Sequence, residues 1–352
     1  MSDFRPVEGF EEVWRPVAKP RPRLTRSIIA SAGRQKSGGA GARLARIVAG
    51  APEAVVSVTG RPRNRPDLLR HLNYIGRDGE VGLEDRDGVK FLGRPALSEL
   101  VRDWATADRF DSHRRVHSPL GQSIVLSMPP GTARSPFHAA AREFGQEAFG
   151  QNFDYVFARH DDTPNPHVHL TVRSLGDDGR RLHPMKADLA AWRELFASVL
   201  RDHGVEAEAT LRRTRGVTLK TERWIVRRLR ILHEAGRREL PRLLQDSYLR
   251  AAEAAFGGDT SVTPWELRMV QRQARIRSLY LAQAQALLRS QDPSDRNLGR
   301  AVEKFVADMP SPDSQRLKLA RELRAANNQL KVRQLEQGLQ PERSGSDRDR
   351  GR

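Results

Sequence analysis

The chain has 352 residues, of which 61 are Lys or Arg and 44 are Asp or Glu, so its formal net charge is +17 and its sequence pI is near 11.0. This excess of basic side chains favours a polyanionic partner, with nucleic acid as the leading candidate. There is no cysteine, which excludes disulfide bonds and thiolate metal sites, and no apolar run suggests membrane insertion or a signal peptide, so we expect a cytoplasmic protein.

The first part of the chain combines basic side chains with Pro-rich and Gly-rich patches, such as the segment RQKSGG at residues 34–39. A segment of this composition does not bury enough apolar surface to fold by itself. We therefore predict a basic disordered arm over residues 1–52.

Residues 53–216 mix short β-branched runs with amphipathic helical patterns. The patterns predict strands at 54–59, 122–128 and 154–158, a hairpin at 80–91, and helices at 67–75, 96–108, 135–149 and 188–203. These connections fit an α+β domain with a central antiparallel sheet, covered on one face by helices and open on the other.

After residue 216 the composition changes to helix-forming residues with almost no strand signal. We predict a mainly α-helical, basic C-terminal domain over 217–338, whose charged surface either contacts DNA or is simply solvated. Apolar residues recur there at helical intervals, which supports helix: Leu267, Val270, Ala274, Leu281 and Leu288. Residues 339–352, with arginines among Ser, Gly and Asp, are predicted to be a disordered tail.

The most informative stretch is RHDDTPNPHVH at residues 159–169. His167 and His169 are two apart, so on a strand their imidazoles project from the same face. The prolines between the two runs indicate a tight reversal, which would place His160 on the neighbouring strand. Three neutral imidazoles suit a divalent ion such as Mn²⁺ or Zn²⁺ and leave positions open for substrate or water. Asp162 strengthens this interpretation over that of solvated histidines, because a ligating imidazole normally donates its other N–H to a carboxylate.

Three motifs in order resemble those of the MobA/VirD-type relaxases, which belong to the HUH endonuclease superfamily. They are YIGRDG at residues 74–79, Ser127 after an apolar strand, and HDDTPNPHVH at residues 160–169. The resemblance covers roughly residues 54–216. It implies an HUH relaxase-like fold and an enzyme that nicks one DNA strand at an origin of transfer, with Mg²⁺, Mn²⁺ or Zn²⁺ as the divalent metal ion.

Tyr74 is the expected nucleophile. A tyrosine suits an enzyme that cuts a strand and later rejoins it, because the phosphotyrosyl ester at the 5′ end conserves the bond energy. Tyr74 lies at a predicted helix end beside glycine, where a phenol can meet a ligand. Tyr155 is expected on a strand facing away from His160, and Tyr248 and Tyr280 are expected to pack between helices. Asp162 would either orient a ligating histidine or help to take the phenolic proton.

The resemblance also implies partners. These are the hairpin and adjacent single strand of origin-of-transfer DNA, a type IV coupling protein and relaxosome accessory proteins, with translocation of the protein to the recipient. Ser127 is expected near the DNA backbone, and five arginines are candidates for phosphate contacts. They are Arg77, Arg173, Arg212, Arg213 and Arg215.

Two alternatives stay open at this point. A rolling-circle replication initiator shares the metal hairpin, but its tyrosine usually follows the histidines, whereas Tyr74 precedes them. A non-catalytic origin-binding accessory protein would have lost Tyr74 or a ligand, and all are present. Asn165 departs from the pattern, because some relatives have a further histidine there, so metal preference can differ.

Overall fold

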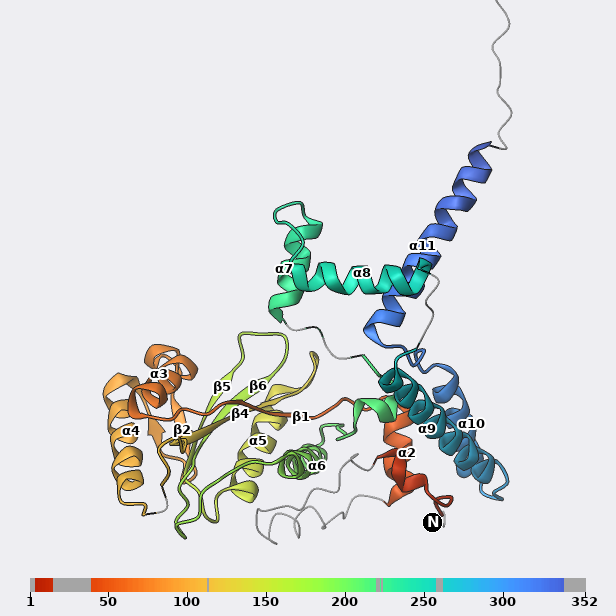
Figure 1. Ribbon diagram of the computed structural model, residues 1–352. Helices are drawn as coiled ribbons and strands as arrows, with labels where there is room; N and C mark the ends of the chain where they lie inside the picture. Colours follow the sequence, from red (N-terminus) through yellow and green to blue (C-terminus); the bar gives the residue numbers. More distant parts are fainter. Residues whose placement is uncertain are drawn as a thin grey trace, which may run out of the picture. The chain divides into compact units, whose positions relative to one another are not determined.

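A computed structural model describes residues 4–14, 39–112, 114–219, 222, 224–257 and 262–338. They form a six-stranded sheet with helices, followed by a mainly helical region, which confirms the predicted fold class (Figure 1). All strand pairs are antiparallel, and the strand order is β1-β4-β6-β5-β2-β3. The predicted tail, and residues 1–3 and 15–38 of the predicted arm, lie outside the described residues.

Every predicted strand and helix of the sheet region is present, with ends shifted by a few residues. The strands are β1 Val55–Gly60, β2 Leu83–Asp85, β3 Lys90–Phe91, β4 Gly121–Ser127, β5 Tyr155–His160 and β6 His167–Arg173. The helices are α3 Arg65–Ile75, α4 Gly93–Arg109, α5 Arg134–Ala148 and α6 Lys186–Asp202, with a 3₁₀ turn η2 at Arg77–Gly79.

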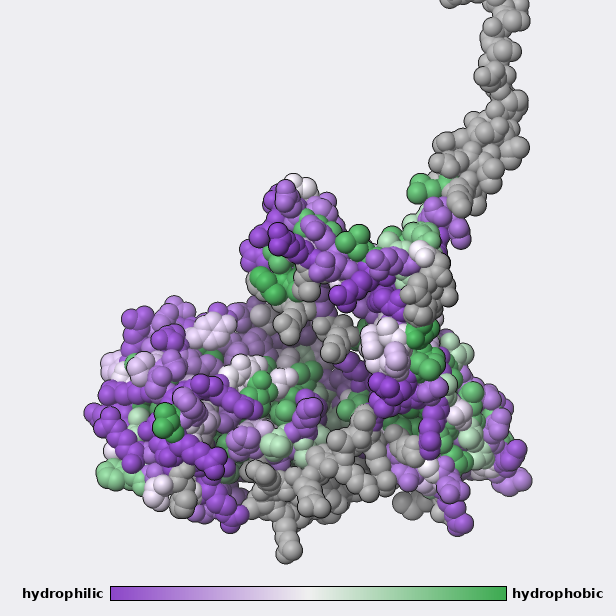
Figure 2. Space-filling model, in the orientation of Figure 1, coloured by the Kyte–Doolittle hydropathy of each residue, from purple (hydrophilic) through white to green (hydrophobic). Residues whose placement is uncertain are grey.

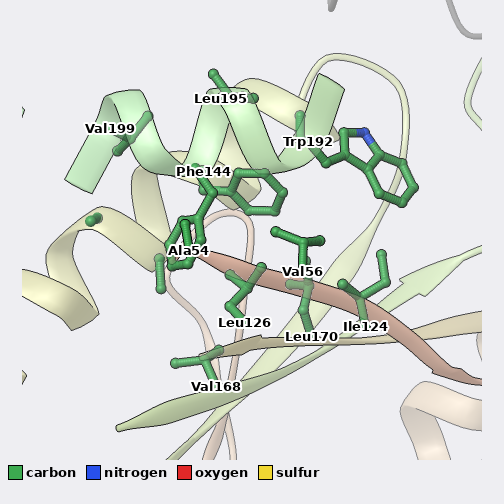
Figure 3. Close-up of a cluster of buried hydrophobic side chains, with 14 of the residues drawn as sticks. Ala54, Val56, Ile124, Leu126, Phe144, Val168, Leu170, Trp192, Leu195 and Val199 are labelled. Atoms are coloured by element: carbon green, nitrogen blue, oxygen red, sulfur yellow. The ribbon is translucent and has the colours of Figure 1, made fainter. Parts of the chain in front are cut away.

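The larger core lies between the sheet and helices α5 and α6. Alternate residues of the strands, including Ile124 and Leu126 of β4 and Leu170 of β6, point into it and meet Phe144 of α5 and Trp192 of α6 (Figure 3). This period-two burial fixes the other strand positions, the histidines among them, on the opposite face of the sheet.

The opposite face is not open along its whole width, so the expected one-sided covering was wrong. Helices α3 and α4 cover the part over β5 and β2, where Leu72 of α3 and Trp104 of α4 pack with Val156 and Ala158. The uncovered part lies over β1 and β4, where Val55 is exposed. A strand that contains Val156 and Ala158 can be buried on one face or on both faces. The sequence pattern therefore did not predict this second layer of helices.

Helix α3 begins and ends at residues suited to those positions. The Asn64 side chain accepts a hydrogen bond from the Asp67 N–H at 2.9 Å, and Pro66 occupies the first turn. Leu68, Leu72 and Ile75 are all buried on one side of the helix. Their burial fixes the rotation of α3 about its axis, and thereby the direction of the residues between them.

Part of the predicted disordered arm is ordered, so that prediction was wrong for residues 40–48. They form helix α2 (Ala40–Val48), and a 3₁₀ turn η1 spans Phe10–Val13. Leu44 and Ile47 of α2 are buried. Its arginines find internal carboxylates: Arg43 pairs with Glu194 at 2.7 Å, and Arg46 pairs with Glu208 at 2.9 Å.

The chain divides into two compact units. The first contains the residues up to Leu211 together with Ala282–Phe305, and the second contains Arg212–Leu281 and the residues from Val306 onward. The elements after the sheet are η3 Arg212–Arg215, α7 Trp224–Glu234, α8 Arg242–Phe256, α9 Pro264–Leu288, α10 Pro293–Ala307 and α11 Gln315–Gly338. None of the described helices is both long enough and apolar enough to cross a membrane.

The buried stripe of α9 is not made of the apolar series in its sequence. Leu267 and Leu281 are exposed, and the buried positions are Glu266, Gln273, Ile276, Tyr280, Gln283, Ala284 and Leu287. Polar groups in this stripe bond to backbone carbonyls: the Gln273 amide donates to Arg213 at 3.1 Å and the Tyr280 hydroxyl donates to Thr214 at 3.1 Å. Periodicity of apolar residues does not foresee burial that depends on such distant acceptors.

Candidate metal and tyrosine site

The three histidines predicted as ligands lie together on one face of the sheet. The register pairs His160 of β5 with His167 of β6. His169 lies two residues further along β6, on the same face of the sheet. Their ring centroids are 4.6 to 5.3 Å apart, and one nitrogen from each ring lies within 4.8 Å of the others. Nitrogens at this spacing can converge on one ion with only small side-chain rotations.

Backbone carbonyls orient two of the three rings. The His160 Nε2 lies 2.7 Å from the Ile75 carbonyl oxygen, and the His167 Nδ1 lies 3.1 Å from the Asn165 carbonyl oxygen. Because a carbonyl can only accept, each of these nitrogens carries the proton. The Nδ1 of His160 and the Nε2 of His167 are therefore left with lone pairs for a metal ion.

The surroundings of His169 are suited to a metal ligand. Its Nδ1 is buried and has no hydrogen-bond partner among the described residues. Burial first, and the neighbouring His160 and His167 second, lower the pKa of His169 to about 4. The ring is therefore neutral at neutral pH, as a ligand must be, and the donor set fits a divalent cation that takes imidazole nitrogen.

Tyr74 lies beside the histidines, in the last turn of α3. Its side chain is 70% exposed, and its ring centroid is 6.5 Å from that of His169 with the two planes at 88°. The next residue, Ile75, provides the carbonyl that accepts from His160. The backbone at the tyrosine is therefore tied directly to one of the three imidazoles.

A fourth histidine, not identified in the sequence, makes a second tie between α3 and the sheet. His71, one turn before Tyr74, lies with its Nε2 3.0 Å from the Thr171 Oγ1 on β6. Burial lowers the pKa of His71, which keeps the ring neutral at neutral pH. Only a weak pattern in the sequence pointed to His71: it lies three residues before the candidate tyrosine, and so on the same side of a helix.

Asp162 makes no hydrogen bond to a histidine among the described residues, which argues against the first of its two expected roles. Its carboxylate instead pairs with Arg77, and both side chains are about half exposed. Desolvation raises the pKa of Asp162, but its backbone hydrogen bond and the charges of Arg77 and His160 outweigh it, so the net shift is downward. Arg77 and Asp78 both have positive φ angles, a conformation that is rare outside glycine.

The loop between β5 and β6 is held from its other side as well. Arg134, in the first turn of α5, donates to the Asp161 carboxylate at 2.8 Å and to the Thr163 carbonyl at 2.9 Å. Sequence reasoning did not identify this residue. Together, the Arg77 and Arg134 contacts fix the loop that joins His160 to His167.

The candidate DNA contacts fall into three places. Ser127 lies in the register row of His167, next to the metal cluster, and Arg77 is paired with Asp162 of the loop between the histidine strands. Arg173 lies at the far end of β6, is only 15% exposed and pairs with Asp154 at 2.9 Å, so it is internal and the prediction of a surface phosphate contact was wrong. The other three, Arg212, Arg213 and Arg215, form η3 at the start of the second unit.

Three kinds of comparison relate this chain to known proteins. Residues 98–205 match the family model of the MobA/VirD2-like relaxase nuclease domain. The chain is 29% identical over 178 residues to the T-DNA border endonuclease VirD2 of Agrobacterium fabrum, covering 45% of this chain and 39% of that protein. It is 29% identical over 177 residues to the protein of the same name from Rhizobium rhizogenes, covering 45% and 40%.

The matched region thus spans about two fifths of the length of these relatives. A solved structure titled "Molecular Basis of Vancomycin Resistance Transfer in Staphylococcus aureus" is 12% identical and covers 46% of this chain and 99% of its own, with a TM-score of 0.31. That value is too low to establish a common fold.

Proposed function

We propose that this chain is a site- and strand-specific DNA relaxase that nicks one strand at an origin of transfer, because residues 98–205 match the model of the MobA/VirD2-like relaxase nuclease domain and the chain is similar to VirD2. The observation that carries the proposal is an exposed tyrosine whose ring lies 6.5 Å from a cluster of three histidines. At this separation the tyrosine oxygen and a metal ion held by the histidines could act on the same phosphate group.

In the proposed reaction the Tyr74 oxygen attacks the scissile phosphorus and forms a P–O bond. The bond from phosphorus to the 3′ oxygen breaks, and that oxygen leaves as a 3′-hydroxyl after taking a proton. The phenolic proton is lost to water or to Asp162, and the 5′ phosphate stays joined to Tyr74. The reverse attack by a 3′-hydroxyl restores the strand, so no cofactor is consumed.

His160, His167 and His169 would hold a divalent ion, Mg²⁺ or Mn²⁺ with Zn²⁺ as a third option. Such an ion supplies charge neutralisation at the non-bridging oxygens of the phosphate. Around it, the Ile75 carbonyl orients His160, and the pair of Asp162 with Arg77 joins the tyrosine turn to the histidine loop. Ser127 lies where it can contact the DNA backbone beside His167.

The test is incubation of the full chain with a supercoiled plasmid carrying the cognate origin and Mn²⁺ or Mg²⁺. We expect an open circular product with protein attached to the 5′ end. Tyr74→Phe should lose at least about a thousandfold in nicking rate, equivalent to about 4 kcal/mol, because it lacks the nucleophile. Tyr248→Phe is the matched control and should nick normally. Equal nicking by Tyr74→Phe and wild type would show that another group attacks.

The proposal extends to partners and location. Origin DNA with a hairpin and an adjacent single strand is the proposed substrate, and the net charge of +17 supports a polyanionic ligand. We propose that the protein acts in the cytoplasm with relaxosome accessory proteins, and that a type IV coupling protein passes it to the recipient with the attached strand.

A further inference from the structure

A pocket containing two arginines lies beside the outer edge of the sheet. Strand β1 pairs with β4 on one side, and no strand of the described residues pairs with its other side. At that edge, between β1 and α6, is a pocket of about 460 Å³. It is lined by Ser57, Val58, Thr59, Gly60, Arg61, Leu189 and Arg193.

Arg193 is a partly buried cation without an anionic partner. No hydrogen bond or ion pair of its guanidinium is found in the described part of the chain, although most other partly buried arginines of the sheet region pair with a carboxylate. Burial lowers the pKa of Arg193, and the charge of Glu53 opposes this shift only in part. A half-buried guanidinium with no hydrogen-bond partner among the described residues is available to an arriving anion.

Further exposed arginines follow the pocket residue Arg61 along the chain. Arg61, Arg63 and Arg65 follow β1, and none of them has an ion-pair partner among the described residues. The Pro62 carbonyl between them accepts from the Leu120 N–H at 2.8 Å, which holds this loop against the segment before β4.

We define these residues as the arginine strip: Arg61, Arg63, Arg65 and Arg193. It lies at the end of β1 remote from the histidines, because Val55 at the other end of β1 shares the row of Ser127 and His167. The two ends of β1, Val55 and Gly60, are five residue steps apart, which is about 17 Å. That length corresponds to about five base steps of a DNA strand in a duplex, at about 3.4 Å per step.

We propose that the arginine strip binds the phosphate backbone of the DNA several nucleotides away from the cut, with the pocket of Arg61 and Arg193 holding one phosphate group. The inference rests on the proposed function only in taking DNA as the ligand. Guanidinium groups without carboxylate partners match phosphate in charge and in donor geometry. The strip therefore adds affinity and register without contacting the scissile phosphate.

The experiment measures DNA binding in a Tyr74→Phe background, which prevents cleavage. The probes are a fluorescein-labelled 30-nucleotide single strand of mixed sequence and two origin oligonucleotides, extending four or twelve nucleotides on each side of the nick site. We expect Arg61→Gln with Arg193→Gln to weaken binding of the 30-mer about tenfold at 0.1 M salt. The slope of log affinity against log salt should fall by about 1 to 2.

Arg102→Gln is the matched control, because Arg102 is exposed on α4 and paired with Glu99. It should bind like the parent. The longer origin oligonucleotide should bind the parent more tightly than the shorter one does, and this difference in affinity should be smaller in the double variant. Arg193→Gln should not lower the thermal unfolding midpoint, as it would if the guanidinium served only to stabilise the fold. Should the double variant fold poorly, Arg61→Gln with Arg63→Gln, both exposed, replaces it.

Unchanged affinity and salt slope in the double variant would overturn the proposal. So would loss of binding to a labelled polyglutamate with DNA binding intact, because the strip would then dock an acidic protein segment. The mixed-sequence probe needs no cleavage, so absence of nicking at the origin would count against the proposed function and not against the strip.

Discussion

Two contacts made by single residues hold Tyr74 over the histidine cluster. One joins His71 to Thr171, and the other joins the Ile75 carbonyl to His160. They lie three residues before and one residue after the tyrosine, so the last turn of α3 has little freedom to move away from the sheet. The histidine motif itself could be read from spacing, but Thr171 is 100 positions from His71, and no local pattern connects them.

Thr171→Val should slow nicking without weakening metal binding. The substitution removes the hydroxyl bonded to His71, worth about 1 kcal/mol, and the looser helix should lower the nicking rate about fivefold. Mn²⁺ affinity, measured by calorimetry, should match wild type because the three ligands are untouched. Thr171→Ser keeps the hydroxyl and should nick normally. The positioning role is wrong if both variants nick alike.

At the scale of elements, helix α2 shows that a basic segment can be wrongly predicted as disordered when the carboxylates that pair with it are distant in the sequence. Arg43 and Arg46 made the N-terminal residues look like a mobile arm. In the fold these side chains reach Glu194 and Glu208, separated from them by 151 and 162 positions. The buried carboxylate of Glu208, which is 1% exposed, contacts both arginines and holds α2 against the sheet domain.

Glu208→Gln should destabilise the fold through α2. The neutral amide leaves Arg43 and Arg46 partly buried without their shared anion, and breaking such a buried pair costs about 3 kcal/mol. The free energy of unfolding, measured by urea denaturation, should fall by about that amount. Glu206→Gln changes an exposed carboxylate two residues earlier and should alter it by less than about 0.5 kcal/mol. Equal effects of the two variants would contradict the anchoring of α2.

At the scale of the whole molecule, the histidine cluster joins parts of the chain that are remote in sequence. It brings β5 and β6 together with the end of α3, and its three imidazoles lie close enough to share one cation only in the folded chain. A ligand that binds only the folded state stabilises it by mass action.

Mn²⁺ at about 100 times its dissociation constant should therefore raise the unfolding free energy by about 2.7 kcal/mol. Thermal unfolding with and without the metal measures this, and EDTA should reverse the increase. His167→Ala should abolish the metal-dependent part, whereas His117→Ala, at an exposed histidine of the turn before β4, should keep it. A rise of equal size in His167→Ala would exclude this cluster as the binding site.

The sequence by itself determined the antiparallel α+β fold, the exclusion of thiolate ligands and the common face of His167 and His169, because strand periodicity and composition are local properties. The tertiary structure alone decided the rest. It placed Tyr74 next to His169, and it placed backbone carbonyls, and not Asp162, beside His160 and His167. It also paired Arg173 with Asp154 and left Arg193 without an ion pair at the edge of the sheet. These outcomes depend on contacts between distant segments, whose geometry is set by packing on both faces of the sheet.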